Sequence, residues 1–453
     1  MSTRGGPQGT GGSRRDRDAL STTQEVWDAR GPHFNVAKVR LEVIDGSAIG
    51  ANQVFEAERI VIGSHASADF VVRDATVSRL HCELVPDSGC VVIRDLESKN
   101  GTRIHGIVFK EATLTGTAIL QLGHSKIRMV VDRDTASLPL FDGDRLGWLV
   151  GQSAAMRRVF AIIERAAASA ETVLIQGEPG TGKAAVASTI HQLSARASQP
   201  LRVVDCSAIP RHRLEAELFG DDRGGAAAAH PGAFEAASGG SLLLDEIGEL
   251  PIDLQPKLLG VLEHGEVRRI GGSQPIPVDV RVMAATSRSL AAQVNGHRFR
   301  SDLYYRIAAI RVSLPPLRSR FEDLPLLVAD LASRLRMTAE DRGWLASPPL
   351  LSDLGAHHWP GNLRELQTYL EACVAAKTPD VIDAPEPAPA AERAAIDTTQ
   401  PLHEARAAWM AVFDRAYATA MLREHGGNVS AAARASGADH LTFCRLLRLA
   451  GIK

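Results

Sequence analysis

The stretch TVLIQGEPGTGKAAVASTI at residues 172–190 decides the fold of the central part of the chain. An apolar strand leads into a glycine-rich turn, and a helical pattern follows at once. Glycines allow backbone N–H groups to turn inward around a phosphate, and the positive end of the helix dipole attracts the same anion. This order favours a nucleotide site over a glycine-rich turn without a ligand. The residues predicted to hold the nucleotide are Gly177, Gly180, Thr181, Gly182, Lys183 and Ala184.

A second motif lies downstream, where the apolar strand LLLDE of residues 242–246 ends in two acids. Lys183 is expected to reach the β- and γ-phosphates, while Asp245 binds Mg²⁺ and Glu246 activates water. A capped helix start would also explain the two acids, but both motifs occur together at a sensible spacing. Ala184 stands where the general motif has Ser or Thr, so one magnesium ligand of that motif is missing.

The pattern around these motifs divides the rest of the chain into segments. Residues 146–320 alternate helices with buried strands, which predicts an α/β domain with a largely parallel sheet. Residues 321–377 are helical, as expected for a small lid, and residues 378–402 form an Ala/Pro-rich linker. Residues 403–453 are helical and rich in Ala, Leu and Arg.

Upstream, residues 36–132 contain short β-strands such as RIVIG and HCELV, separated by Gly, Asp and Asn. This spacing predicts an all-β sandwich. Residues 1–35 are rich in Gly, Ser and Arg with no apolar segment behind the charges, which predicts a disordered tail and not a signal peptide. The predicted fold is therefore multidomain: an all-β sandwich, an α/β P-loop domain with a helical lid, and an all-α end.

Composition narrows the functional classes. The chain has 453 residues and a formal net charge of −2, which gives no global sign of a nucleic-acid or membrane partner. No apolar run approaches the length of a membrane span. The five cysteines are scattered without a close pair at metal spacing, which fits a reduced cytoplasmic compartment better than a disulfide framework or a zinc site.

Seven ordered segments within residues 146–377 resemble the AAA+ domain of bacterial enhancer-binding proteins, the ATP-driven activators of sigma-54 RNA polymerase. They are GEPGTGKA, ELFG, GAFEAASGG, LLLDEIGELP, DLYYRI, LPPLRSRFEDLPLL and WPGNLRELQ. The resemblance implies ATP and Mg²⁺ as cofactors and a ring, a hexamer, with ATP between subunits. It also implies that Arg300 and Arg306 act on a neighbour's γ-phosphate and that Arg364 in the lid senses the nucleotide. The family often has Glu at position 184, so the missing hydroxyl is a family trait and alanine a further departure.

In this family, ELFG leads into a loop with the consensus GAFTGA, whose Phe and Thr touch the sigma factor. Ala226 stands where the Phe would be, and Ala227 where the Thr would be. Truncating an aromatic anchor typically costs about 2 kcal/mol or more, so contact with sigma-54 is predicted to be lost or weakened. The alternative is compensation by another residue of the loop, and His230 is the only large side chain nearby.

Two further positions depart from the family pattern. Asp205 replaces an Asn that holds the catalytic Glu until the nucleotide state changes. Asp205 would repel Glu246 and not donate a hydrogen bond to it, unless one of the two is protonated. Ser287 replaces a sensor Asn, and its shorter hydroxyl is expected to hold water but to reach less far. These residues predict a ring that binds ATP, hydrolyses it slowly and no longer remodels sigma-54 polymerase.

Three motifs in the β-rich region, IGS, VSRLH and NGT, resemble a forkhead-associated domain, which binds phosphothreonine on loops at one edge of a β-sandwich. The resemblance implies that Ser78 and Asn100 bond the phosphate and the peptide backbone, and that Arg79 adds positive charge. His81 is interpreted as a structural brace for the loop.

One phosphate contact departs from the family pattern. Ser64 replaces an arginine that contacts the phosphate in the family, and a charge-assisted contact is about twice as strong as a neutral one. Arg73, Arg79 and His65 are candidate substitutes. The alternative is a sandwich that retains the fold and binds a surface without phosphate.

The last fifty residues resemble the Fis-type DNA-binding end of the same activators. Asn428 is predicted to cap a short helix, Gly437 to end it and Asp439 to cap the next helix, which together make a helix-turn-helix. Phe443 and Leu447 are expected to face inward. The residues expected to face the DNA groove are His440, Leu441, Thr442, Arg445 and Arg448.

The basic patch of this segment is mild, so a monomer would bind DNA weakly and dimerisation is needed. Residues 403–422 form the candidate dimer interface. The alternative is an αα-hairpin that packs without DNA.

These observations predict a bacterial DNA-binding transcriptional regulator of the sigma-54 activator type. It would bind ATP through an AAA+ ring and a phosphothreonine-containing protein through its N-terminal domain, with lost or weakened sigma-54 contact. Its enzymatic activity would be that of an AAA+ ATPase, ATP binding being better supported than hydrolysis. The predicted assembly is a homo-oligomer, dimeric through the C-terminal domain and a ring through the AAA+ domain, with no membrane partner.

Two alternatives stay open. The first is a fully functional, ATP-hydrolysing sigma-54-dependent activator with an unusual contact loop. The second is an adaptor recruited by phosphothreonine without ATPase output. Sigma-54 contact through the loop separates the predicted function from the first alternative, and unchanged function after loss of Lys183 would favour the second.

Overall fold

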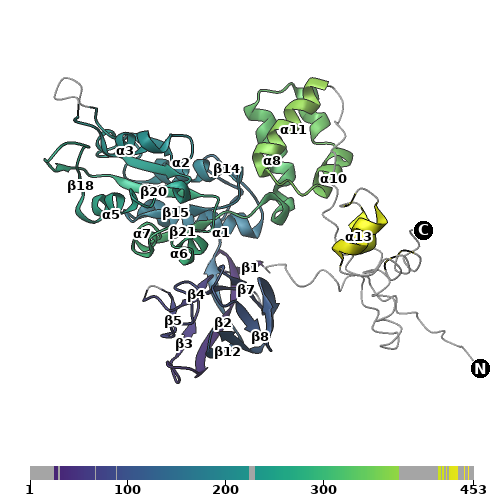
Figure 1. The fold of residues 1–453 in the computed structure, drawn as a ribbon. Coiled ribbons are helices and arrows are strands. Elements are labelled where there is room, and N and C mark those ends of the chain that lie inside the picture. The colour runs from purple at the N-terminus through teal and green to yellow at the C-terminus, as the bar shows by residue number, and fades with distance from the viewer. Residues whose placement is uncertain are drawn as a thin grey trace, which may run out of the picture. The chain divides into compact units, whose positions relative to one another are not determined.

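The computed structural model comprises two compact units, Met1–Thr378 and Pro379–Lys453 (Figure 1). No helix among the described residues is long and apolar enough to cross a membrane. The structure describes residues 25–28, 31–66, 68–87, 89–223, 230–376, 417–419, 421–422, 425, 428–436, 443 and 447.

Two sheets form an N-terminal β-sandwich, as predicted. The first has the order β1-β2-β12-β11-β8-β9, with β3 on β2, and the second has the order β10-β7-β6-β4-β5. Side chains from both sheets alternate inward into one apolar core, which contains Leu41, Ile62, Leu84 and Ile127. The strands are β1 (Glu25–Asp28), β2 (Gly31–Asp45), β3 (Asn52–Phe55), β4 (Ile60–Gly63), β5 (Phe70–Val71), β6 (Cys82–Pro86), β7 (Val91–Asp95), β8 (Thr102–Ile104), β9 (Ile107–Phe109), β10 (Glu111–Leu114), β11 (Thr117–Leu122) and β12 (Ser125–Pro139).

The sandwich is longer than the predicted span of residues 36–132. Strands begin at Glu25 and Gly31, within the segment expected to be a disordered tail, and β12 continues to Pro139. The prediction was wrong at these ends because β2 and β12 pair along a ladder that continues beyond a register shift between Val131 and Thr135. The polar sequence of this extension hides the alternation that marks a strand. Residues 1–24 lie outside the described residues.

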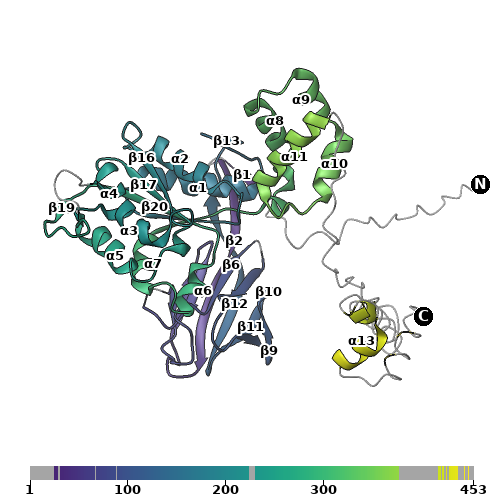
Figure 2. The same ribbon diagram turned by 45° about the horizontal axis from the view of Figure 1, so that its top comes forward.

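A five-stranded parallel sheet of the order β16-β17-β20-β15-β21 forms the core of the α/β domain, as predicted. Alternate residues of the buried strands face opposite apolar clusters, so that Leu243 packs with one helical layer and Leu244 with the other. Helices α1 and α2 cover one face, whereas α3, α5, α6 and α7 cover the other (Figure 2). The strands are β15 (Val173–Gln176), β16 (Leu201–Asp205), β17 (Ser241–Asp245), β20 (Arg281–Thr286) and β21 (Ile310–Ser313), and the helices are α1 (Ala154–Ala168), α2 (Lys183–Leu193), α3 (Arg211–Phe219), α4 (Ala233–Ala236), α5 (Gln255–His264), α6 (Leu290–Asn295) and α7 (Ser301–Ile307).

Shorter elements complete this domain, and a helical lid follows it. The sheet is flanked by two hairpins, β13 (Arg145–Leu146) with β14 (Leu149–Val150) and β18 (Glu266–Val267) with β19 (Ile276–Pro277). The lid comprises α8 (Leu324–Arg334), α9 (Ala339–Leu345), α10 (Pro348–Ala356) and α11 (Asn362–Ala376).

In the C-terminal unit, α13 (Val429–Ala435) begins as the sequence predicts. The Asn428 side chain accepts hydrogen bonds from the backbone N–H groups of Ser430 and Ala431 at 3.1 Å each. Phe443 and Leu447 are buried, which confirms that they face inward. Gly437, Asp439 and the predicted groove-facing residues lie outside the described residues, as does most of the candidate dimer helix.

Candidate functional site

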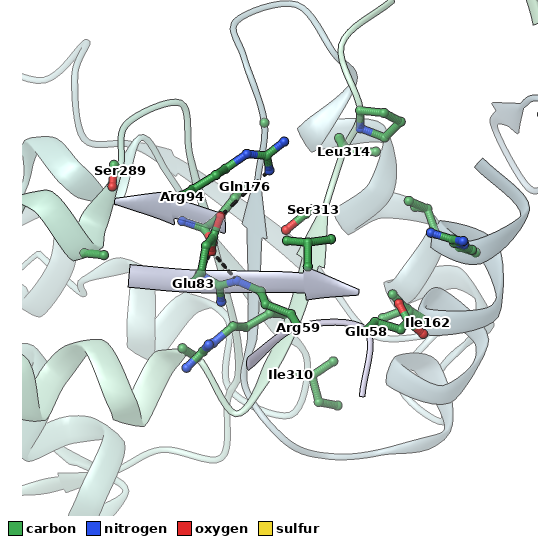
Figure 3. Close-up of a pocket in the computed structure, with 18 of the residues that line it drawn as sticks. Glu58, Arg59, Glu83, Arg94, Ile162, Gln176, Ser289, Ile310, Ser313 and Leu314 are labelled. Carbon is green, nitrogen blue, oxygen red and sulfur yellow. Dashed lines mark hydrogen bonds and ion pairs between the residues drawn. The ribbon is translucent and has the colours of Figure 1, made fainter. Parts of the chain in front are cut away.

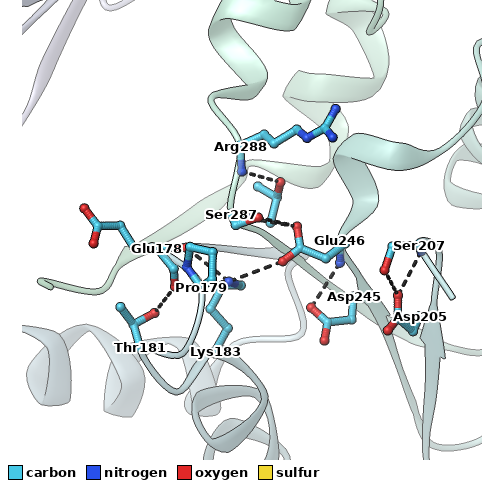
Figure 4. A network of polar contacts seen from close by, with 12 residues as sticks. Glu178, Pro179, Thr181, Lys183, Asp205, Ser207, Asp245, Glu246, Ser287 and Arg288 are labelled. Carbon is cyan, nitrogen blue, oxygen red and sulfur yellow. Dashed lines mark hydrogen bonds and ion pairs between the residues drawn. The ribbon is translucent and has the colours of Figure 1, made fainter. Parts of the chain in front are cut away.

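The carboxyl ends of β15, β17 and β20 bring the predicted nucleotide residues to one edge of the sheet (Figure 4). Because neighbouring parallel strands end at the same edge, residues distant in sequence meet there. The glycine-rich loop follows β15, Asp245 ends β17 with Glu246 directly after it, and Ser287 follows β20. One polar cluster therefore contains the predicted phosphate, metal and water-activating groups.

The loop conformation depends on its glycines. Gly180 and Gly182 have φ values of +78° and +105°, a region that side chains disfavour. A Cβ atom at Gly180 would also lie 2.1 Å from the Gly361 carbonyl oxygen of the lid. Thr181 closes the turn by donating its hydroxyl to the Glu178 carbonyl at 2.8 Å. The loop is thus formed and packed against the lid.

Lys183 points back across this loop. Its side chain is 8% exposed, and its Nζ donates to the Gly177 carbonyl at 3.1 Å and to the Glu178 carbonyl at 3.4 Å. The same Nζ lies 3.4 Å from Glu246 Oε1. The cation and the predicted water-activating carboxylate therefore face the same space (Figure 4).

Glu246 is held by Ser287. The Ser287 backbone N–H donates to Glu246 Oε2 at 2.9 Å, and the Ser287 hydroxyl donates to the same oxygen at 2.8 Å. Glu246 adopts a left-handed backbone conformation with φ +48°, which is uncommon for a residue other than glycine. The end of the strand thus carries the backbone and the hydroxyl of Ser287 directly to the carboxylate, while its contact with water stays a prediction.

Asp205 lies at the end of β16, opposite Asp245 in the strand register. Its Oδ1 accepts hydrogen bonds from the Ser207 hydroxyl at 2.6 Å and from the Ser207 N–H at 2.8 Å. The hydroxyl hydrogen bond is the main cause that lowers the pKa of Asp205. An ionised carboxylate cannot donate a hydrogen bond, so Asp205 does not take the place of the amide that holds the catalytic Glu in the family.

The Asp245 carboxylate fits a magnesium ligand. Burial raises its pKa, with the negative charges of Glu246 and Asp205 adding to the effect. Mg²⁺ commonly uses one or two carboxylates together with substrate phosphates. Ala184 supplies no oxygen, and no group of three His, Cys, Asp or Glu residues in the described part of the chain could hold a metal. The donor set therefore fits Mg²⁺ held jointly by Asp245 and nucleotide phosphates.

The lid brings Arg364 to the glycine-rich loop. This exposed residue of α11 lines a cavity of about 470 Å³ together with Pro179, Gly180 and Tyr369. An arginine at this position can face a phosphate from the lid side. Its role as a nucleotide sensor stays a prediction.

Asn362 is a site residue that the sequence reasoning missed. Its side-chain amide donates to the Pro179 carbonyl at 3.0 Å and to Glu178 at 3.2 Å, while its Oδ1 accepts from the Leu317 N–H at 2.7 Å. It is fully buried and has φ +53°. Glu178 also forms a bidentate pair with Arg318. The Asn after Pro-Gly in WPGN, a residue type that tolerates positive φ, was the available signal.

The two predicted trans-acting arginines are both on α7 or at its start. Arg300 pairs with Asp302 at 2.6 Å, and Arg306 donates to the Leu262 carbonyl at 2.7 Å. Both contacts lie within the subunit, at a partly exposed surface. Their action on a neighbouring subunit stays a prediction.

The predicted sigma-54 contact loop is closed at its base by a backbone pair. The Asp221 N–H donates to the His230 carbonyl at 3.0 Å, and the His230 N–H donates to the Asp221 carbonyl at 3.0 Å. Ala226 and Ala227 lie outside the described residues. His230, the side chain named above for compensation, lies at the base of the loop.

The base of this loop is also held by a charged cluster, which leads to a stability prediction. Arg269 pairs with Glu235 at 2.5 Å and with Asp222 at 3.1 Å. Arg269→Ala is expected to lower the thermal midpoint of unfolding by several degrees at neutral pH, measured by calorimetry. The hydrogen bond from Arg269 lowers the pKa of Glu235.

The sign of the pH dependence follows from that shift. A carboxylate with a lowered folded-state pKa stabilises the fold above its unfolded pKa, and the contribution is lost as pH falls through the folded pKa. The difference between Arg269→Ala and the unsubstituted protein should therefore shrink as pH is lowered below about 4. Arg223→Ala, which removes an exposed pair with Asp221, is the matched control. A midpoint difference that is independent of pH would contradict the assigned role of Glu235.

The loops of the β-sandwich place the predicted phosphopeptide residues together. Ser78 Oγ accepts from the Lys99 N–H at 2.9 Å, and the Asn100 amide donates to the Thr76 carbonyl at 2.7 Å. His81 is fully buried, accepts from the Ser78 N–H at Nδ1 and contacts the Gly101 carbonyl through Nε2. Burial lowers the pKa of His81. This geometry is that of the brace predicted for His81.

The candidates for the missing arginine differ in their surroundings. Arg79 and Arg73 are exposed beside this edge, while His65 stacks on the ring of Tyr305 with centroids 5.1 Å apart and an interplanar angle of 6°. Arg79 is exposed and adjacent to Ser78 in the sequence, so it stays the candidate cation for a phosphate at Ser78. Recognition of a phosphopeptide stays a prediction.

Comparison with known protein families matches three regions of the chain. Residues 149–313 match the sigma-54 interaction domain, and residues 318–400 match an AAA+ ATPase lid domain. Residues 42–133 match the family described as inner membrane component of T3SS, cytoplasmic domain.

Individual relatives extend these matches. The chain is 47% identical over 232 residues to the DNA-binding transcriptional activator HyfR of Escherichia coli (strain K12), covering 51% of this chain and 35% of HyfR. It is 39% identical over 315 residues to the transcriptional regulatory protein ZraR of the same organism, covering 68% of this chain and 70% of ZraR. The chain thus spans about a third of HyfR but more than two thirds of ZraR.

Two solved structures are similar in part. NtrX from Brucella abortus in complex with ATP has 34% identity and a TM-score of 0.48, covering 68% of this chain and 70% of NtrX. A structure from a study of phosphothreonine-dependent FHA domain interactions has 32% identity and a TM-score of 0.20, covering 21% of this chain and 97% of that domain.

Proposed function

The chain belongs to the family of sigma-54-dependent transcriptional activators, and from that premise we propose that it is a DNA-binding regulator whose AAA+ module binds ATP and whose sigma-54 contact is lost or weakened. The observation that carries the nucleotide part is the convergence of Lys183, Asp245 and Glu246 at one edge of the parallel sheet (Figure 4). DNA binding is proposed for the C-terminal segment on the strength of its sequence.

Each residue of this cluster has a distinct task in the proposed ATP hydrolysis. Lys183 and the loop N–H groups hold the phosphates, and Asp245 is the residue that would hold Mg²⁺, which neutralises phosphate charge when bound. Glu246 accepts a proton from the attacking water. Its Oε1 faces Lys183, while Oε2 is occupied by two hydrogen bonds from Ser287. Turnover therefore depends on the position that Ser287 imposes on Glu246.

Loss of sigma-54 contact is supported by what surrounds the alanine run. A backbone pair joins Asp221 to His230, and residues 222–229 lie between them in the sequence. Those residues contain no aromatic side chain. Because buried aromatic anchors dominate many interfaces, this segment offers little energy for docking on a sigma factor.

A trapping experiment tests this proposal. The protein is mixed with sigma-54 in the presence of ADP and a metal fluoride, beside the double variant Ala226→Phe with Ala227→Thr. We expect nucleotide to bind in both proteins and sigma-54 to bind at most to the double variant. Stable binding of sigma-54 by the unsubstituted protein would instead establish the first alternative, a working activator.

A second function is favoured by the edge of the β-sandwich. Ser78 and Asn100 lie on adjoining loops, and Arg79 is exposed next to them. We propose that this edge binds a phosphothreonine peptide, with Arg79 supplying the charge-assisted contact. The adaptor alternative uses the same edge but requires no ATPase output, so the effect of losing Lys183 on regulation distinguishes the two.

A further inference from the structure

The outer face of strand β4, in the second sheet of the sandwich, is covered by the α/β domain. Ile60 and Ile62 of β4 face the sandwich core, whereas Val61 between them belongs to the apolar cluster of the α/β domain. All four residues of β4 are buried. Leu80, from the loop before β6, packs into the same cluster. An antiparallel sheet commonly leaves one face exposed to solvent. Strand β4 is instead buried on both faces, because the α/β domain packs against its outer face.

A single polar side chain connects the docked loops to the α/β domain. Asn295, the last residue of α6, donates to the Leu80 carbonyl at 2.7 Å and to the Leu96 carbonyl at 2.9 Å. The Leu80 N–H is 3.5 Å from the oxygen of the same amide. Asn295 therefore satisfies the backbone of two sandwich loops at once. Removing it would leave two part-buried carbonyls without these partners, which is costly.

The docked surface includes the helix that carries the predicted trans-acting arginines. Tyr305 of α7 stacks on His65 of the sandwich, and Tyr304 of the same helix lines a cavity that Arg59 of the sandwich also lines. Arg300 precedes α7 and Arg306 lies within it. The sandwich thus holds one side of α7 against its own subunit.

The docked loops are the same loops that carry the predicted phosphopeptide residues. Leu80 follows Ser78 and Arg79 in one loop, and Leu96 starts the loop that contains Asn100. His65, a candidate phosphate contact, is engaged by Tyr305. A peptide several residues long that lies across this edge therefore meets the surface already taken by α6 and α7.

The interface is incompletely packed, so the docked state can open. A cavity of about 1260 Å³ lies between the domains, lined by charged side chains from both (Figure 3). Glu83 bridges Arg59 and Arg94 within it. Atoms that line a void lack dispersion partners on one side, so docking is weaker than the packing of either core. A second attachment places Arg158 of α1 over the Phe34 ring at 3.6 Å.

We propose that the β-sandwich is a releasable clamp on α7, and that a phosphothreonine peptide bound at Ser78, Arg79 and Asn100 competes with the docked state and frees the arginine helix. The release step rests on the proposed phosphopeptide function. The clamp itself rests on the contacts of Asn295, Val61, Leu80 and Tyr305 alone.

Hydrogen–deuterium exchange of the 453-residue chain tests the clamp. Asn295→Ala is expected to raise exchange in residues 301–307, as is Leu80→Ala, which acts from the sandwich side. Asn52→Ala, which removes an exposed amide on β3 of the other sheet of the sandwich, is the matched control. Unchanged exchange in both docking variants would overturn the clamp. A variant that unfolds would show raised exchange throughout the chain. The other docking variant would then show whether the sandwich holds α7.

Competition is tested by titrating the 453-residue chain with an arrayed set of phosphothreonine peptides and their unphosphorylated counterparts. Because a partly populated binding-competent state weakens the apparent affinity by its fraction, Asn295→Ala should tighten phosphopeptide binding roughly three- to tenfold. In the unsubstituted protein, the phosphorylated form alone should raise exchange in residues 301–307.

The outcomes separate the two parts. An unchanged affinity in Asn295→Ala, with binding still abolished by Ser78→Ala, would overturn the competition while phosphopeptide binding stands. Absence of binding in every protein would overturn the phosphopeptide function and the release step together. The hydrogen–deuterium exchange of α7 in Asn295→Ala would still show whether the sandwich holds this helix.

Discussion

Glu246→Gln is expected to lower ATP turnover by about 10²–10⁴-fold while ATP binding is retained. The substitution keeps the shape of the side chain but removes its ability to accept a proton. It also removes the negative charge 3.4 Å from Lys183 Nζ, so the lysine stays available for phosphate. Phosphate release measured at saturating ATP, beside binding of a fluorescent ATP analogue, separates the two effects.

Glu249→Gln provides the matched control. Glu249 lies three residues further along the chain and pairs with Arg288 at 2.5 Å, so this variant changes the same charge without touching Lys183. Its turnover should match that of the unsubstituted protein. If the unsubstituted protein released phosphate no faster than Glu246→Gln, the site would bind ATP without hydrolysing it, and the hydrolytic part of the proposal would be wrong.

Arg306→Ala and Arg300→Ala should each lower turnover by about 10³–10⁵-fold if these residues reach a neighbour's nucleotide. Among the described residues, the Arg306 side chain donates hydrogen bonds only to the backbone carbonyl of Leu262. The loss would therefore come from missing charge at the phosphate, not from a broken fold. Arg298→Ala, an exposed arginine at the same turn, is the control and should keep full turnover.

Mixing two inactive variants distinguishes action in trans from action in cis. Subunits with Glu246→Gln retain both arginines, and subunits with Arg306→Ala retain an intact acid pair. Where an Arg306→Ala subunit supplies the acid pair and the adjacent Glu246→Gln subunit supplies the arginines, one complete site forms. A mixture should therefore regain part of the activity. A mixture as inactive as its components would contradict a site shared between subunits.

The nucleotide site could be predicted from sequence because each of its motifs is local. The glycine-rich turn, Lys183 and the pair Asp245–Glu246 each sit at the end of a strand with an unmistakable apolar pattern, and parallel strands carry such ends to one edge. The burial of Phe443 and Leu447 followed in the same way from helical spacing. The start of β2 and the end of β12 were not predicted, because polar residues interrupt the alternation of apolar and polar side chains there.

Only the tertiary structure determined the contacts between segments that are far apart in the chain, because no sequence pattern connects such segments. The hydroxyl and N–H of Ser287 meet Glu246 across 41 positions, and the Asn362 amide meets Pro179 across 183. Asn295 meets Leu80 across 215 positions, and only the docking of two domains explains why Val61 is buried on the outer face of its sheet. The sequence by itself determined which chemical groups stand at the strand ends, since that depends on neighbours in the chain. Tertiary packing determined which side chains form hydrogen bonds with each other, because distant backbone segments must first come together before a serine or an asparagine lies within hydrogen-bond distance of its partner.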